Sequence, residues 1–301
     1  MCGIVRPAVS IAIPTYNRAE KLRRAVQSVL AQTHEDLEVV ISDNASTDGT
    51  AELLSDLAAA DERVRVVRQP VNRGMVANLD AVARLAEGDH VMLLSDDDWL
   101  APRCVERTLE VLRAAPDRAG ALGRVAYMRD GAEAPSGQPV ALEQADGAGR
   151  VRGYFAAVHA DHGNTWMYAL VPQQVVRSLP PMRNVLGFDW LHVAALAFHG
   201  PIAMVDETLI FRELGGTSES TARNVRASGL PTTHAKAPHL VIAREVLADI
   251  GWRSPVYVPL GTARRLALAS ACAGSVPRRN ARHVLFHLAP AAVQRRWHAR
   301  A

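Results

Sequence analysis

The chain has 301 residues, of which 49% are hydrophobic and 22% are charged, and its formal net charge is +3. This composition is ordinary for a globular protein, and it excludes a disordered, collagen-like or coiled-coil chain. Its three cysteines are widely separated, which indicates neither a zinc site nor a disulfide framework and favours a reducing cytoplasm. The chain start lacks a secretory pattern, and no apolar run reaches about 18 residues, so we expect no signal peptide and no membrane span.

The first third of the chain alternates between short apolar, β-branched runs and segments with helical periodicity. The predicted strands are 9–13, 37–42, 64–67 and 90–95, and the predicted helices are 19–31, 51–60 and 75–86. This β-α order predicts an α/β fold with a mixed, mostly parallel sheet flanked by helices. In such sheets ligands bind beyond the carboxyl ends of the strands, so the residues that follow each strand are the first candidates for a site.

The rest of the chain has a less regular pattern. The expected elements are a helix at 103–114, an irregular stretch at 129–149, a strand at 165–171, helices at 172–178 and 189–198, a strand that begins at 202, a mobile loop at 214–231 and helices from 239 onward. The strand, loop and helix signals here are weaker because Gly, Ala and Pro interrupt the apolar periodicity.

Polar residues follow each of the four predicted strands and should meet at one edge of the sheet. These segments are Pro14–Arg18, Asp43–Gly49, Asn72–Gly74 and Asp96–Asp98. Tyr16 offers a flat face to a nucleobase, and Asp43 can accept a hydrogen bond from a ring N–H. Arg18 or Arg73 can contact a phosphate, because a guanidinium holds such anions with two parallel hydrogen bonds.

The triplet Asp96, Asp97 and Asp98 stands directly after a buried strand. Three neighbouring carboxylates repel one another, and a divalent cation offsets that repulsion. Mg²⁺ and Mn²⁺ prefer oxygen ligands, and Mg²⁺ usually takes one or two carboxylates together with substrate phosphates. An acidic cap on the helix that begins near Pro102 is the alternative, and it explains one of the three acids better than all of them. The triplet therefore predicts a Mn²⁺ or Mg²⁺ site.

Four segments together, Ile13–Arg18, Ser42–Thr50, Asn72–Gly74 and Leu94–Trp99, resemble the nucleotide-sugar half of a GT-A fold, family 2 inverting glycosyltransferase. The resemblance is strong over about residues 8–105 and looser over 160–215. It implies a nucleotide-diphosphate sugar as donor and a divalent metal bound through an Asp-x-Asp motif. The residues expected at the donor are Pro14, Thr15, Tyr16, Asn17, Arg18, Asp43, Asn72, Arg73, Gly74, Asp96, Asp97 and Arg212.

The metal motif departs from the family pattern. Many members read Asp-x-Asp-Asp, with a proline four residues after the last acid. Setting Pro102 against that proline places Asp97 and Asp98 on the pair and Ser95 on the first acid. Reading Asp96-x-Asp98 as the motif is the alternative frame. Both frames keep Asp98 near the metal and leave open which of Asp96 and Asp97 is the second carboxylate.

Inversion needs a general base that deprotonates the acceptor hydroxyl. In the family this base is a carboxylate at the start of a helix in the second half of the domain, and Asp189 matches that position. A plain helix N-cap is the competing explanation for this residue. The family often has Glu-Asp here, and Phe188 stands in the Glu position. The neighbouring Trp190 either lines the acceptor pocket or packs.

Several other residues are weaker candidates. Arg212 either meets the diphosphate or sugar or is a solvated surface arginine, and His234 either joins the metal or is inert. The stretch 214–220 has the composition of a lid that orders over the donor. Trp166 either touches the acceptor or packs in the core.

The last 24 residues of the chain contain no acid. They contain six arginines, at positions 278, 279, 282, 295, 296 and 300. This basic tail fits an interfacial helix on an anionic membrane, or a packed helix with a solvated basic face, although Pro290 interrupts it.

The sequence thus predicts a GT-A domain at 1–215, with a nucleotide-sugar half at about 8–105 and an acceptor half at about 106–215, followed by a flexible loop and helical extension at 216–301. The expected enzyme is a metal-dependent, inverting glycosyltransferase of the hexosyltransferase type, with UDP favoured as nucleotide. The expected acceptor is a small natural product, a surface-polysaccharide precursor or a lipid-linked glycan, with no nucleic-acid partner. The expected location is cytoplasmic, with peripheral contact at the inner membrane face through the basic tail.

Two other functions compete with this one. A nucleotidyltransferase that makes the nucleotide sugar would want a glycine-rich loop near the start, and Ile11–Arg24 lacks that pattern. A non-catalytic protein that binds a sugar nucleotide would lose nothing when Asp189 is changed to Asn.

Overall fold

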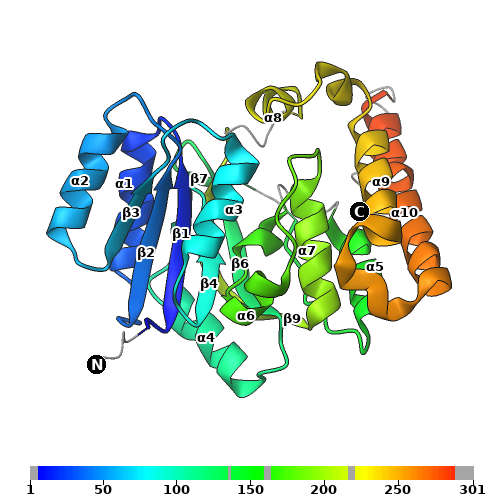
Figure 1. The fold of residues 1–301 in the computed structure, drawn as a ribbon, viewed down its shortest axis with the longest axis horizontal. Helices are drawn as coiled ribbons and strands as arrows, with labels where there is room; N and C mark the ends of the chain where they lie inside the picture. The colour runs from blue at the N-terminus through cyan, green and yellow to red at the C-terminus, as the bar shows by residue number, and fades with distance from the viewer. Residues whose placement is uncertain (1–5, 135–136, 159–163, 216–220, 289–301) are drawn as a thin grey trace.

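The computed structural model describes residues 6–134, 137–158, 164–215 and 221–288, with side chains up to residue 276. A five-stranded sheet with the order β3-β2-β1-β4-β8 forms one half of the molecule (Figure 1). Its strands are β1 (Val9–Thr15), β2 (Leu37–Asp43), β3 (Val64–Arg68), β4 (His90–Leu93) and β8 (Val171–Pro172). β1 to β4 pair in parallel and β8 is antiparallel to β4. The predicted α/β fold with a mixed, mostly parallel sheet is confirmed.

Two hydrophobic cores lie on opposite faces of this sheet, because side chains along a strand alternate in direction. Ile11 and Ile13 join one core, and Ala12 between them joins the other. Helices of the first core are α1 (Ala19–Leu30), α2 (Thr50–Ala60) and α4 (Cys104–Ala114), and helices of the second are α3 (Met75–Leu85), α5 (Gly147–Ala157) and α7 (Phe188–His199). The sheet is therefore buried on both faces, as its nearly continuous apolar strands require.

A second sheet of four strands has the order β5-β9-β6-β7. Its strands are β5 (Trp99–Leu100), β6 (Gly120–Arg129), β7 (Ala132–Ala134) and β9 (Ile202–Glu213). β6 and β9 run in parallel, and β6 is a strand that the sequence pattern did not predict. A Cβ at Gly123 would lie 2.5 Å from Cβ of Leu209, so only glycine allows the two strands to approach here.

Three predicted elements of the second half need correction. The predicted strand at 165–171 is wrong, because Thr165–Tyr168 form the 3₁₀ helix η2 and only Val171–Pro172 pair as a strand. The stretch 129–149 is not wholly irregular, since it contains β7 and the start of α5. The predicted loop at 214–231 contains the helix α8 (Thr221–Ala227). The short helix α6 (Gln173–Ser178) follows the prediction.

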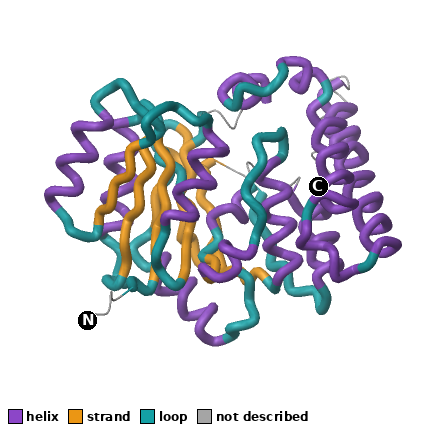
Figure 2. The backbone as a smooth tube through the Cα atoms, viewed as in Figure 1, coloured by secondary structure: helices purple, strands orange, loops and turns teal. Residues whose placement is uncertain are grey.

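The C-terminal part is helical, as expected, and packs against α5 and α7. It comprises η4 (Thr232–Lys236), α9 (Pro238–Ala248), the π-helical turn η5 (Asp249–Arg253), η6 (Pro255–Leu260) and α10 (Thr262–Leu288). Ile242 and Val246 of α9 and Leu268 of α10 share one hydrophobic core with α5 and α7. Figure 2 shows the strands in one half of the molecule and this mass of helices in the other.

No helix in the described part of the chain combines the length and the apolar character that crossing a bilayer requires. The structure describes the basic tail only in part: its residues up to 288 continue α10 without placed side chains, and its last arginines lie beyond residue 288. Both interpretations of the tail therefore stay predictions.

Candidate active site

One cavity of about 650 Å³ opens at the carboxyl ends of the strands, where the sequence predicts a site. The predicted site residues on its wall are Pro14, Thr15, Tyr16, Arg18, Asn72, Asp96, Asp97, Asp98, Asp189 and Arg212. The residues that follow β1 and β4 thus meet the start of α7 and the end of β9 around a single space. The volume of this cavity and the charged residues on its wall suit a small charged ligand.

The loops after β1 and β2 are tied together by side-chain caps. Asn17 adopts a left-handed backbone conformation, and its Oδ1 accepts a hydrogen bond from the N–H of Thr47 at 2.8 Å. Its own N–H donates to Oγ of Ser46 at 2.9 Å. Asn17 therefore fixes the shape of the cavity rim without standing on the cavity wall, while Tyr16 remains 43% exposed.

Asp43, the predicted base-contacting acid, is fully buried at the end of β2. Its Oδ1 accepts from the N–H of Ser46 at 3.0 Å, and its Oδ2 lies 3.5 Å from Nε of Arg68. Asp43 does not stand on the cavity wall, and its neighbour Asn44 does.

The loop that contains Asn72, Arg73 and Gly74 is held by Asn44. Nδ2 of Asn44 donates to Oδ1 of Asn72 at 2.9 Å, and Oδ1 of Asn44 accepts from the N–H of Arg73 at 2.9 Å. Gly74 has φ +84°, a conformation that favours glycine, just before α3 begins. Of these three loop residues, Asn72 is the one on the cavity wall.

Asp96 and Asp97 share the guanidinium of Arg18. Nη1 of Arg18 lies 2.7 Å from Oδ2 of Asp97 and 3.9 Å from Oδ1 of Asp96. Oδ2 of Asp96 also accepts from the hydroxyl of Thr15 at 2.8 Å. Burial and the charge of Asp97 raise the pKa of Asp96 to about 6, although Arg18 acts in the opposite direction. One arginine thus offsets part of the repulsion within the triplet.

Asp98 has a different environment, although it also borders the cavity. Its Oδ1 accepts from the N–H of Glu213 at 2.9 Å, and its Oδ2 accepts from the hydroxyl of Tyr168 at 2.5 Å and from Nε of Arg212 at 3.3 Å. The residue is 2% exposed, and burial raises its pKa to about 6 despite the charge of Arg212. Both oxygens of Asp98 are therefore already occupied by donors of the protein.

The acid pair Asp96 and Asp97 fits a divalent cation better than Asp98 does. Among the residues that the structure describes, no group of three or more His, Cys, Asp or Glu side chains forms a metal cage. A hard cation such as Mg²⁺ does not need a full cage, because substrate phosphates complete its ligands. Within the described residues, one side-chain oxygen of Asp96 and one of Asp97 accept no hydrogen bond, whereas both oxygens of Asp98 accept at least one.

Asp189 lies in the first turn of α7 and faces the same cavity. Gly187 precedes it with φ +82°, and this left-handed turn directs the chain into the helix. Burial raises the pKa of Asp189, while a hydrogen bond from Asn164 and the charge of Arg212 act in the opposite direction. A carboxylate with a raised pKa beside a ligand-sized cavity has the properties of a general base.

Arg212 lies near the end of β9. It is not a solvated surface arginine. Its side chain is 12% exposed, pairs with Asp98 and lies 5.1 Å from the ring of Tyr168. Tyr168 was not among the predicted site residues, because its segment was predicted as a plain strand. Trp166 in the same segment is fully buried against Tyr154, so it packs in the core.

The structure separates the other weak candidates. His234 lies in η4 and is not among the residues of the cavity wall, where His239 stands instead. Trp190 both borders the cavity and packs against Phe155, with ring centroids 6.3 Å apart. The greater part of the predicted lid, residues 216–220, falls outside the described residues.

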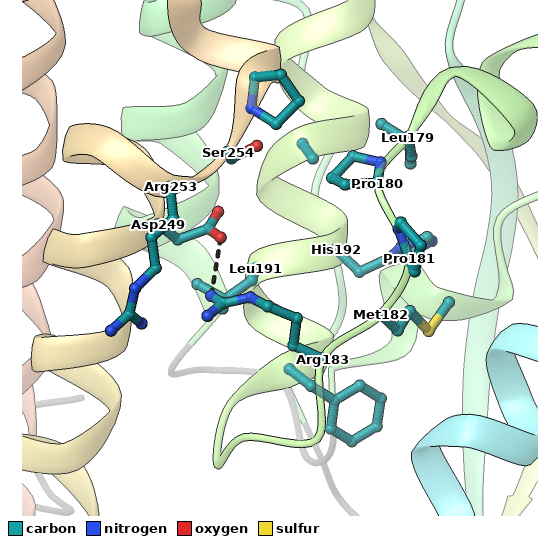
Figure 3. A pocket seen from close by; sticks show the side chains of 13 residues that line it. Leu179, Pro180, Pro181, Met182, Arg183, Leu191, His192, Asp249, Arg253 and Ser254 are labelled. Carbon is teal, nitrogen blue, oxygen red and sulfur yellow. Dashed lines mark hydrogen bonds and ion pairs between the residues drawn. The ribbon is translucent and has the colours of Figure 1, made fainter.

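A smaller cavity of about 110 Å³ lies between the segment before α7 and the C-terminal helices (Figure 3). Arg183 reaches across it to Asp249, with Nη2 and Oδ1 2.9 Å apart. Arg183 also lies 3.9 Å from Glu245 of α9. Its charges are thus paired internally, and the pairs connect the segment that leads to Asp189 with the C-terminal helices.

Residues 10–170 match the family model described as Glycosyl transferase family 2. This match covers more than half of the chain, and the chain therefore belongs to glycosyl transferase family 2. A stretch of 104 residues is 41% identical to chondroitin synthase of Pasteurella multocida (strain Pm70), covering 35% of this chain and 11% of that protein. The chain therefore matches only about a tenth of the length of that relative.

Two solved structures have similar folds. One is S. aureus TarS 1–349 in complex with UDP, with a TM-score of 0.59 and 16% identity, covering 96% of this chain and 77% of that chain. The other is the mannosyltransferase PcManGT from Pyrobaculum calidifontis in complex with GDP-Man and Mn²⁺, with a TM-score of 0.50 and 18% identity, covering 94% and 81%. At such identities the likeness shows the fold alone. Together with the family match, it confirms the predicted GT-A fold and the glycosyltransferase class.

Proposed function

We propose that this chain transfers a sugar from a nucleotide-diphosphate sugar to an acceptor hydroxyl, with inversion at the sugar carbon. The observation that carries this proposal is the single cavity that gathers the acid pair Asp96 and Asp97, two arginines and Asp189. The paired acids and arginines suit a diphosphate with its counter-cation, and a separate buried carboxylate suits a base. One cavity thus contains the groups needed for both the leaving group and the nucleophile.

The nucleotide end of the donor belongs at the loops after β1 and β2. Pro14, Thr15 and Tyr16 border the cavity there, and the exposed ring of Tyr16 can stack on a base. UDP is the favoured nucleotide, which is supported by the fold shared with a TarS structure in complex with UDP. In this arrangement Asp43 supports the base site from beneath, through the loop that it caps at Ser46.

Asp96 and Asp97 are the residues that would hold Mn²⁺ or Mg²⁺. Asp98 has a structural role, because its carboxylate connects the loop after β4 to Tyr168, Arg212 and Glu213. A bound divalent cation would neutralise the charge that develops on the departing diphosphate. A divalent cation beside the donor is supported by PcManGT, a protein of similar fold whose structure is in complex with GDP-Man and Mn²⁺. Arg18 and Arg212 are the cations of this chain at the same wall, and both suit phosphate oxygens.

Asp189 takes the proton of the acceptor. The acceptor oxygen forms a bond to the anomeric carbon as the bond from that carbon to the diphosphate breaks, and the hydroxyl proton passes to the carboxylate of Asp189. The raised pKa of Asp189 makes the carboxylate a stronger base than an exposed aspartate. Attack and departure on opposite faces of the sugar give inversion.

The acceptor end of the cavity has apolar walls. Leu186, Phe188, Trp190 and Ile242 border it near Asp189. Such walls favour an acceptor that presents an apolar face beside its hydroxyl, as a small natural product or a lipid-linked glycan does. A surface-polysaccharide precursor is the alternative, and the likeness to a chondroitin synthase over 104 residues supports it.

The test is thermal unfolding of the full chain with a panel of nucleotide-diphosphate sugars, with and without Mn²⁺. We expect one sugar nucleotide to raise the Tm in a Mn²⁺-dependent manner, and that compound then serves as donor in turnover assays. The variant Asp189→Asn should retain this stabilisation and lose turnover. Full turnover in excess chelator contradicts the cation, and full turnover of Asp189→Asn contradicts the base.

A further inference from the structure

Asn164 lies behind the proposed base and is almost wholly buried, with 2% of its surface exposed. It directly precedes η2 and has φ 53° and ψ 62°, a left-handed conformation that costs most residues other than glycine about 1–2 kcal/mol. Asparagine tolerates this region better than other residues that carry a side chain. The backbone conformation at this position therefore favours glycine and asparagine over most other residues. Asparagine differs from glycine in carrying a neutral side-chain amide.

The amide of Asn164 makes one contact with the site. Its Nδ2 donates to Oδ2 of Asp189 at 3.1 Å. Its Oδ1 is buried and has no hydrogen-bond partner among the described residues. A buried amide oxygen without a partner is unfavourable for folding, so the backbone conformation explains the residue type but not the burial of this amide. The contact with Asp189 is the interaction that its placement serves.

We infer that Asn164 is a positioning residue for the general base, and this inference rests on the proposed function. Its N–H holds Oδ2 of Asp189 and so fixes how the carboxylate is turned toward the acceptor. Asp189 comes from the first turn of α7 and Asn164 from the segment before η2, so the contact fixes the carboxylate from a second element. The base is then held in one orientation before the acceptor binds.

The same contact favours the ionised form of the base. Burial favours the neutral acid of Asp189, and a neutral acid cannot accept a proton. The N–H of Asn164 stabilises the carboxylate without adding a charge, and Arg212 on β9 acts in the same direction from across the cavity. The other titratable groups on this wall are the triplet that ends in Asp98, together with Tyr16, Arg18, Tyr168, Glu213 and His239.

Two variants separate the amide from the backbone. Asn164→Gly removes the donor and retains a residue that adopts positive φ without strain. Asn164→Asp retains the shape and places a second carboxyl group against Asp189, so that the two share one proton. Asn184→Asp is the matched control, because Asn184 is an exposed asparagine whose amide donates to the carbonyl of Ser228.

The first readout needs no ligand: carboxyl ¹³C NMR titration of Asp189 in the full chain. We expect Asn164→Gly to raise the pKa of Asp189 by about one unit, which corresponds to about tenfold, as for loss of one hydrogen bond to a charged group. Asn164→Asp should raise it further, and Asn184→Asp should leave it unchanged. Far-UV circular dichroism checks that each variant is folded.

The second readout is the pH profile of turnover with the donor selected by the thermal screen. We expect the acid limb of kcat in Asn164→Gly to move up by the same amount, so that kcat on that limb is about tenfold lower, with the donor KM unchanged. An unchanged pKa, or a loss of kcat without any shift of the profile, overturns the inference. Full turnover of Asp189→Asn overturns the base itself, so the two failures are distinguishable.

Discussion

The three aspartates after β4 should respond differently when each is shortened to alanine. Asp98→Ala removes the acceptor of three donors, namely the N–H of Glu213, the hydroxyl of Tyr168 and Nε of Arg212. Removal of one partner from a buried ion pair costs about 3–5 kcal/mol, because the other charge is left uncompensated. We expect Asp98→Ala to lower the free energy of unfolding by about that amount.

Asp97→Ala should cost much less. Asp97 accepts one hydrogen bond from the side chain of Arg18, and Asp96 remains 3.9 Å from the same guanidinium. Partly exposed pairs of this kind contribute up to about 1 kcal/mol. The order reverses for the cation: Asp97→Ala should lose Mn²⁺ affinity, and Asp98→Ala should retain most of it.

Urea unfolding followed by circular dichroism gives the free energies, and titration calorimetry gives the Mn²⁺ affinities. Domains usually have about 5–15 kcal/mol of stability, so a folded Asp98→Ala variant should remain for the calorimetry. A decrease in the free energy of unfolding below about 1 kcal/mol for Asp98→Ala refutes the structural role of Asp98. Normal Mn²⁺ binding by Asp97→Ala refutes Asp97 as a metal ligand. Asp98→Asn serves where the alanine variant is too unstable, because it retains the shape of the side chain.

Other outcomes follow from the same contacts. Turnover of Asp189→Asn should be at least about 1,000-fold lower than that of the wild type. Wild-type turnover should decrease as the pH is lowered through a pKa above that of an ordinary aspartate, because the ionised form of Asp189 is the base. The free energy of unfolding should fall from about pH 4 to about pH 6, since the raised pKa of Asp98 makes the folded state bind more protons there, and Asp98→Asn should flatten this fall. Gly187→Ala should lower the Tm more than Gly131→Ala, because both have positive φ but a Cβ at Gly187 would also lie 3.0 Å from Ile242. Calorimetry should show tighter Mn²⁺ binding with UDP than without.

The first half of the fold was predictable because its signals are local. Strands such as Val9–Thr15 are continuous apolar runs, and the helices between them have clear periodicity. β6 was missed because its sequence is rich in Gly and Ala, which are poor strand formers, and because it pairs with β9, about eighty residues later. The segment Thr165–Tyr168 contains residues typical of strands, and yet tertiary packing makes it a 3₁₀ helix.

The same division holds for the site. The residues after the strands could be predicted from sequence, since the ends of parallel strands meet at one edge. Asn164 and Tyr168 could not, because their roles come from contacts with Asp189 and Asp98, which are distant in sequence. The proposed choice within the triplet rests on the fold, because like residues in a row differ only in what surrounds them.

These surroundings show how the protein's own groups compensate the charge of three adjacent acids. Asp98 accepts hydrogen bonds from Glu213 and Tyr168 and pairs with Arg212, and Asp96 and Asp97 share Arg18. A cation that binds the shared pair displaces Arg18 from it. A diphosphate gives that arginine a new anionic partner at the same wall, so the cation and the nucleotide each remove a cost of binding the other. If Arg18 exchanges a carboxylate for a phosphate in this way, we expect the proposed cation site to bind weakly alone and more tightly with the donor.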